Sequence, residues 1–118
     1  LFKQVYSWKD IINNSSYYNN YTYNKTIYLM SEEKFFDNGF LILKESTEIG
    51  SPIGAVFFEY YENDNKVIKS LKKYSEKIQC IVGKNIVENS VEFGNTQRPS
   101  LDDFADKINT LDFLLKLS

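Results

Sequence analysis

Apolar residues recur at helical spacing at the start of the chain: Leu1, Phe2, Val5, Trp8 and Ile12. Polar residues lie between them, and a polar run, residues 13–16, ends the pattern. The spacing predicts an amphipathic helix over residues 1–13 that needs a partner surface to bury Trp8. Residues 14–24 are rich in Asn and Tyr, which favour turns and caps, so a second helix is predicted around residues 23–31.

Three short apolar runs follow, at residues 40–43, 53–60 and 78–82. Each has the length of a strand and is bounded by polar or turn-forming residues. Between the second and third runs, residues 62–65 suit a helix start. The apolar positions after that start mark one helix face: Val67, Ile68, Leu71 and Tyr74. This order predicts an α/β fold, in which a strand-helix-strand layer with a parallel crossover is flanked by helices.

The end of the chain predicts a loop and then helix. Gly, Asn and Pro favour a loop over residues 93–99, and Ser100 followed by acidic residues favours a helix start. The last apolar cluster, residues 111–117, suits the packed end of a helix. It is far shorter than the roughly 20 residues that a membrane span requires, so we expect no membrane span.

Composition narrows the function classes. The chain has 118 residues, 42% of them hydrophobic and 25% charged, which suits one globular domain. Fourteen basic residues against sixteen acidic ones give a net charge of −2, so we expect no nucleic-acid partner. The absence of His removes the usual general base and the commonest zinc ligand, and we expect no metal site.

The only cysteine, Cys80, lies in the middle of the apolar run 78–82. There a thiol behaves as a small hydrophobe, so we interpret Cys80 as a buried structural residue. A single Cys also forms no internal disulfide, which favours a reducing compartment and a cytoplasmic location.

The beginning of the chain indicates a piece of a longer protein. No capping residue precedes the apolar pattern at Leu1, and the only Met is Met30. We therefore expect residues 1–118 to be a piece of a longer protein, and a homo-oligomer is left open.

Two other function classes stay open at this point. If the Tyr-rich segment 17–28 is exposed, as this second class expects, it suits a small α/β protein-interaction module without catalytic activity, because Tyr is enriched at interfaces. Triplets of the glycosylation type begin at Asn14, Asn20 and Asn24, which on a secreted protein would mark a surface. With Asn this frequent, chance explains such triplets.

Residues 93–114 read FGNTQRPSLDDFADKINTLDFL. This segment resembles the closing signature of acyl-CoA reductases of the LuxC type, Phe-Gly-x-x-Gln-x-Pro-x-Leu-x-Asp-Tyr-Ala-Asp-Gly-x-Asp-Thr-x-x-Phe-Leu. The resemblance extends in order and spacing from about residue 8 to the end of the chain. Phe104, Lys107 and Asn109 depart from the pattern, where the family has Tyr, Gly and Asp.

The resemblance implies an aldehyde dehydrogenase-like fold, here a partial catalytic domain. Residues 1–118 are then expected to be the C-terminal portion of that domain, with the rest of the same chain as a partner. The implied reaction is attack of a Cys thiolate on a fatty acyl thioester, followed by hydride transfer from NADPH or NADH to release an aldehyde. The family places the nucleophile N-terminal to the matched part, so the chain alone is expected to be inactive.

The resemblance also implies two binding sites in this sequence. Residues 48–53 are similar to the Glu-x-Phe-Gly-Pro segment of aldehyde dehydrogenases, which makes Glu48 the candidate for holding the cofactor ribose, with Glu45 as a lesser candidate. Phe93 and Gly94 are placed like the Phe-Gly loop that lines the acyl channel, so they are the candidates for binding the acyl thioester substrate.

Overall fold

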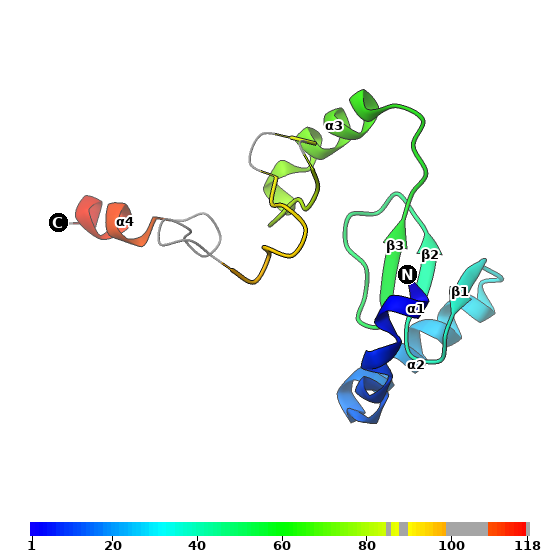
Figure 1. The fold of residues 1–118 in the computed structure, drawn as a ribbon. Coiled ribbons are helices and arrows are strands. Elements are labelled where there is room, and N and C mark those ends of the chain that lie inside the picture. The colour runs from blue at the N-terminus through cyan, green and yellow to red at the C-terminus, as the bar shows by residue number, and fades with distance from the viewer. Residues whose placement is uncertain (85, 88–89, 99–108, 118) are drawn as a thin grey trace. The chain divides into compact units, whose positions relative to one another are not determined.

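The structure is a computed structural model that describes residues 1–84, 86–87, 90–98 and 109–117 (Figure 1). The chain divides into two compact units, Leu1–Tyr60 and Tyr61–Ser118. Each unit is described by itself. Together they contain both helices and a small sheet, so the expectation of a mixed helix and strand fold is confirmed at that level.

The first unit begins with helices. Helix α1 spans Phe2–Val5, the 3₁₀ helix η1 spans Tyr6–Asn13, and helix α2 spans Ser15–Met30. The predicted helical start is confirmed, although Trp8 is 70% exposed. Helix α2 starts well before the predicted residue 23 because Tyr17 and Tyr21 pack against the core, which overrides the weak helix propensity of Tyr.

Helix α2 is capped at both ends. At its start, the Asn14 side chain accepts a hydrogen bond of 3.0 Å from the Tyr17 N–H. At its end, the Glu33 N–H donates to the Tyr28 carbonyl at 3.0 Å, and Glu32 has a φ of 55°. The left-handed Glu32 and the hydrogen bond from Glu33 back to Tyr28, five residues earlier, form a Schellman motif. This motif ends the helix and turns the chain toward the sheet.

The sheet has three strands in the order β1-β2-β3 (Figure 1). Strand β1, Phe35–Asp37, runs antiparallel to β2, Ile42–Glu45, which runs parallel to β3, Ala55–Phe58. The predicted strand at 53–60 is therefore confirmed with shorter bounds, and the one predicted at 40–43 is confirmed two positions later. Residues 46–54, all described, connect the parallel pair without helix or strand.

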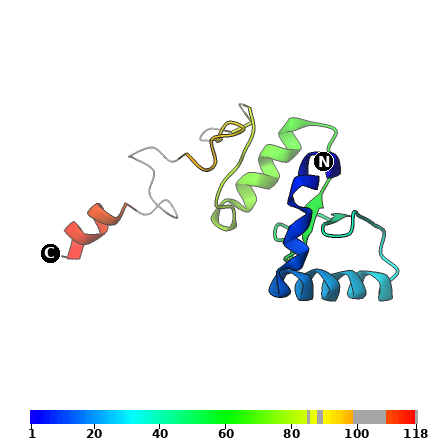
Figure 2. The same cartoon turned by 60° about the horizontal axis from the view of Figure 1, so that its bottom comes forward.

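The core of the first unit lies between α2 and one face of the sheet (Figures 1 and 2). Its buried members are Tyr21, Tyr28, Ile42 and Ala55, and the partly buried side chains packed against them are Ile12, Tyr17, Phe35 and Phe57. Tyr17, Tyr21 and Tyr28 are spaced four and seven positions apart, so they fall on one stripe of α2. Aromatic side chains rather than aliphatic ones thus join this helix to the sheet.

The second unit contains the predicted middle helix. Helix α3 spans Asp64–Lys73 and is capped by Asn63, whose side chain accepts from the Asn65 N–H at 2.9 Å. A short 3₁₀ helix, Ser75–Lys77, follows. Helix α4 spans Thr110–Leu117, so the predicted helix at the end of the chain is confirmed. The prediction that its apolar cluster is packed is wrong for the described side chains, because Phe113 is 55% exposed and Leu115 is 72% exposed. The predicted helix start at Ser100 lies outside the described residues.

The prediction of a third strand at residues 78–82 is wrong. These residues, all described, form no strand, and only Val82 makes an isolated parallel bridge, to Val91. The prediction that Cys80 is buried is also wrong, because Cys80 is exposed. An apolar run becomes a strand only where a neighbouring strand completes its hydrogen bonds, and here the pairing stops at one bridge. The parallel pair is β2 with β3 instead.

Within the part of the chain that the structure describes, no helix is long and apolar enough to cross a membrane.

Candidate functional site

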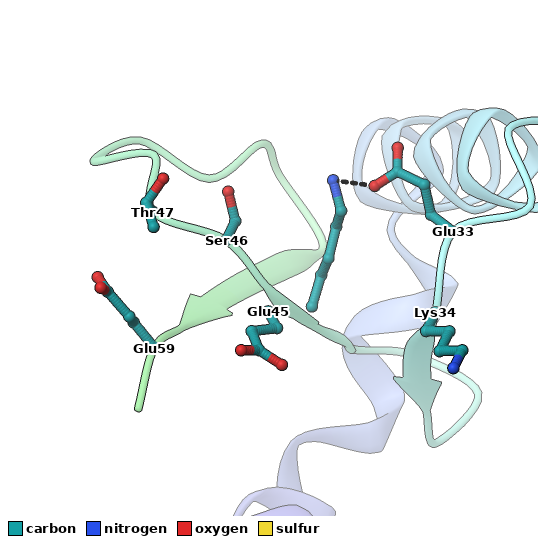
Figure 3. Close-up of a pocket in the computed structure, with 7 residues that line it drawn as sticks. Glu33, Lys34, Glu45, Ser46, Thr47 and Glu59 are labelled. Atoms are coloured by element: carbon teal, nitrogen blue, oxygen red, sulfur yellow. Dashed lines mark ion pairs between the residues drawn. The ribbon is translucent and has the colours of Figure 1, made fainter. Parts of the chain in front are cut away.

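The candidate site lies where the two parallel strands end. Glu45 is the last residue of β2, and Glu59 follows directly after β3. Because the strands are parallel, both ends meet at the same edge of the sheet, which is where open α/β sheets bind ligands. A cavity of about 430 Å³ opens at this edge (Figure 3). Its lining residues are Glu33, Lys34, Lys44, Glu45, Ser46, Thr47 and Glu59.

Lys44 supplies a fixed positive charge in the wall of this cavity. Its ammonium group forms an ion pair with Glu33, drawn as the dashed line in Figure 3. The Lys44 Nζ also lies 4.6 Å from the ring centroid of Tyr28 and 5.5 Å from that of Phe57. The Lys44 side chain is only 16% exposed, so these contacts hold the charge in a defined place.

The contacts of Lys44 also decide its protonation state. The hydrogen bond to Glu33 raises the pKa of Lys44 above its usual value, outweighing the opposing effect of burial, and the nearby Tyr28 and Glu48 add to the rise. A lysine acts as a nucleophile only when neutral. These contacts therefore favour the charged ammonium form of Lys44.

The sequence-predicted residue Glu48 is not among the residues that line this cavity, but it directly follows the lining residues Ser46 and Thr47 in the chain. It belongs to the loop 46–54 that leaves β2, and its backbone N–H donates to the Ser46 hydroxyl at 3.2 Å. Its carboxylate is exposed and lies near enough to raise the pKa of both Lys44 and Tyr28. The loop thus brings Glu48 next to two hydroxyl-bearing residues that line the cavity, Ser46 and Thr47.

The predicted substrate-binding residues belong to the other unit of the chain. Phe93 and Gly94 belong to the second unit, where Phe93 is 77% exposed and Gly94 has a φ of 86° in a turn. The two units are described by themselves, so a role for Phe93 and Gly94 in binding the substrate stays a prediction. Glu45, the lesser candidate for cofactor binding, lines the cavity.

A polar network that the sequence did not reveal fixes the opposite end of the sheet. The buried phenol of Tyr21 donates a hydrogen bond of 2.7 Å to Asp37 Oδ1, and Lys25 Nζ lies 2.6 Å from Asp37 Oδ2. The Gly39 N–H also donates to Asp37, at 2.8 Å. The Asp-Asn-Gly turn was visible in the sequence, but nothing there paired Asp37 with a helix residue sixteen positions earlier.

This network shifts the ionisation of its members. Burial would raise the pKa of Asp37, but its hydrogen bonds from Lys25, Tyr21 and Gly39, with the Lys25 charge, hold it below its ordinary value. Burial raises the pKa of Tyr21 to about 12, and its bond to the Asp37 carboxylate adds to the rise. Tyr21 therefore stays neutral, and the network is structural.

The Tyr-rich segment 17–28 has two faces. Tyr21 and Tyr28 are buried, and the Tyr17 hydroxyl donates to the Phe40 carbonyl at 2.7 Å, whereas Tyr18 and Tyr23 are 49% and 67% exposed. The expectation that the whole segment is exposed is therefore wrong. Only the outward residues of α2 are available to a protein partner.

Comparison with protein-family models, with curated proteins and with solved structures finds no match for this chain. The residues described by the structure also contain no group of His, Cys, Asp and Glu side chains that could hold a metal ion. Any function for this chain is therefore inferred from its sequence, its fold and the cavity at the strand ends.

Proposed function

We propose that this chain is part of an acyl-CoA reductase, which converts a fatty acyl thioester to an aldehyde through a Cys acyl-enzyme and NADPH or NADH. The sequence resemblance of residues 93–114 supports the proposal, because it preserves the order and spacing of a long signature. The nucleophile belongs outside these 118 residues in that family. This chain then contributes binding rather than the attacking group.

The single structural observation that supports the proposal is the position of Glu48. Its exposed carboxylate belongs to the loop after the first of two parallel strands, the same loop that supplies two hydroxyl side chains to the cavity lining, and it acts electrostatically on Lys44 in that lining. A carboxylate there fits a cofactor ribose, whose two hydroxyls donate hydrogen bonds to it. Lys44 lies close by and is paired with Glu33.

The same cavity fits only part of a dinucleotide. Glu45 and Glu59 line it, and carboxylates repel the negative pyrophosphate of the cofactor. The ribose next to the nicotinamide carries no such charge, so it suits this wall better. The phosphates then lie against other residues of the complete enzyme.

The test uses the full reading frame and measures acyl-CoA-dependent oxidation of NADPH and NADH. Glu48→Gln should raise the KM for the cofactor by roughly tenfold and change the KM for the acyl thioester little. Glu62→Gln is the matched control, because that carboxylate side chain is 92% exposed on the second unit, and it should leave both values unchanged. Absence of turnover from the full reading frame would overturn the proposal.

A further inference from the structure

The turn that joins β1 to β2 contains Asn38 and Gly39, the one Asn-Gly pair in the 118 residues. An asparagine followed by glycine readily loses its side-chain amide, because glycine has no Cβ to hinder attack by its own backbone nitrogen. A chemically reactive pair therefore lies at a position where the sheet needs a fixed geometry.

The loss of the amide is an intramolecular acyl transfer followed by hydrolysis. The Gly39 nitrogen attacks Cγ of Asn38, so that a bond forms between these two atoms and the bond from Cγ to Nδ2 breaks. The proton of the attacking nitrogen leaves with the amide group as ammonia, and a cyclic imide remains. Water then opens the imide at either carbonyl, which gives aspartate or isoaspartate. The attack requires the reacting atoms to lie in a suitable orientation, about 3 to 3.5 Å apart.

Hydrogen bonds hold both reacting groups in the folded turn. The Gly39 N–H donates to Asp37 Oδ1 at 2.8 Å. The Asn38 Oδ1 accepts from the backbone N–H of Phe40 at 3.1 Å and from that of Leu41 at 2.8 Å. The Asn38 N–H itself donates to the Leu41 carbonyl at 3.3 Å. Rotation of the Asn38 side chain or of the Gly39 peptide out of its present orientation breaks these bonds.

The leaving group of the reaction is enclosed as well. Asn38 Nδ2 is buried and has no hydrogen-bond partner among the described residues. Departing ammonia needs a proton donor, and the hydrolysis needs water at the imide. A buried amide nitrogen without a donor beside it therefore disfavours both steps while the turn is closed.

Helix α2 holds the turn in place. The Tyr21 hydroxyl donates to Asp37 Oδ1 at 2.7 Å, so the carboxylate that accepts from Gly39 is itself fixed. The Tyr17 hydroxyl donates to the Phe40 carbonyl at 2.7 Å, and the Phe40 side chain is only 5% exposed. Two side chains of the helix thus bind the two ends of the reactive turn.

We propose that Asn38 is a modification site whose deamidation is blocked while Asp37 and α2 hold the turn closed, and which reacts when the turn opens. Isoaspartate adds a carbon atom to the backbone, which is incompatible with the register that pairs Asp37 with Ile42. Both products also place a second carboxylate next to Asp37, and the two charges repel. The modification, once made, therefore hinders the turn from closing again. The proposal does not depend on the proposed reductase activity.

The first test compares the native 118-residue chain with the same chain unfolded in guanidinium chloride, at one pH and temperature. Mass spectrometry of proteolytic peptides follows deamidation at Asn38, and chromatography separates aspartate from isoaspartate. The native rate should be lower than the unfolded rate by roughly tenfold or more. Equal rates would overturn the proposal, and so would a faster native rate, which would make the Asp37 carboxylate a base for the attack.

The second test separates the turn from overall stability. Asp37→Ala should raise the native rate roughly tenfold or more, because it frees the Gly39 N–H, and Tyr21→Phe, which keeps the carboxylate, should raise it several-fold. Ile12→Ala is the matched control, because Ile12 packs against the same core but makes none of the hydrogen bonds that hold the turn, and it should leave the rate unchanged.

Circular dichroism shows whether each variant is folded, and if Asp37→Ala is not, the comparison of Tyr21→Phe with Ile12→Ala decides. An increase from Ile12→Ala as large as that from the turn variants would show that only global unfolding exposes Asn38. That result would overturn the proposed role of Asp37 and α2.

Discussion

Gly54 lies directly against Tyr21, and its φ of 83° is one that L side chains rarely adopt. A Cβ added to Gly54 would lie 2.9 Å from the Tyr21 Cβ and 3.0 Å from its Cα. The backbone of the loop 46–54 therefore approaches α2 as closely as it does only because residue 54 has no side chain. This contact fixes where the second parallel strand begins relative to the helix.

Gly54→Ala should lower the free energy of unfolding by roughly 2 kcal/mol, from backbone strain and from displacement of α2. Chemical denaturation followed by tryptophan fluorescence and circular dichroism measures this. Gly50→Ala is the control, because an added Cβ at Gly50 meets nothing within 4 Å and its φ is not positive. If the two substitutions cost the same, the close contact of Gly54 with α2 does not matter to stability.

The bond between Tyr21 and Asp37 should be measurable by a double-mutant cycle. Tyr21→Phe and Asp37→Asn should each destabilise the first unit by about 1 to 2 kcal/mol, because each removes a charge-assisted hydrogen bond in a half-buried place. The coupling energy should be about 1 kcal/mol. Tyr18→Phe, at an exposed position on α2, is the control and should change stability little. A coupling energy of zero would contradict the network.

Acid should weaken the first unit through Asp37. The folded pKa of Asp37 lies below its ordinary value, so its contribution is present above the unfolded pKa of about 3.9 and is lost as the pH falls through the folded value. Urea midpoints of the unmodified chain should therefore fall in this acidic range more steeply than those of Asp37→Asn. Parallel curves for the two proteins would show that Asp37 contributes no acid dependence.

Glu32 occupies a left-handed position that costs a non-glycine residue about 1 kcal/mol. Glu32→Gly should therefore stabilise the first unit by up to about 1 kcal/mol. Ser31→Gly at the preceding position, where φ is −86°, should not stabilise it and serves as the control. The thermal midpoint measures both effects. A lower midpoint for Glu32→Gly would rule out a Schellman ending at this helix.

Cys80 should react with a thiol reagent in the native protein about as fast as in the unfolded chain, because it is exposed. A kinetic labelling experiment with and without denaturant measures the ratio of the two rates. Cys80→Ser should also leave the free energy of unfolding within about 0.5 kcal/mol of the original. Strong protection of the native thiol would instead support a buried Cys80.

The sequence predicted those elements whose signal is local. Asn63 with the apolar face of α3, and the apolar runs that became β2 and β3, were recognisable from spacing and capping alone. The helix predicted at residues 23–31 is shorter than α2 because Asn and Tyr favour turns. Its true start depends on the burial of Tyr17 and Tyr21 against the sheet, and that contact does not appear in local propensity.

Pairing over distance was the part that the sequence could not supply. The run 78–82 has the composition of a strand, but strand formation needs a partner, and only Val82 finds a bridge. The same limit applies to the candidate site. Glu48 was predicted from the family resemblance. The role of Lys44 depends on its contacts with Tyr28, Phe57 and Glu33, which form only in the folded chain.

The short connection between the parallel strands has a consequence for how the chain folds. Parallel strands are usually joined by a long crossover that contains a helix. Here the short loop 46–54 joins β2 to β3, and Ile42 pairs with Ala55. The entropy lost in closing a loop grows with its length, so this pairing forms at low cost. The sheet and α2 can thus assemble from residues that all precede Glu59, without help from the second unit.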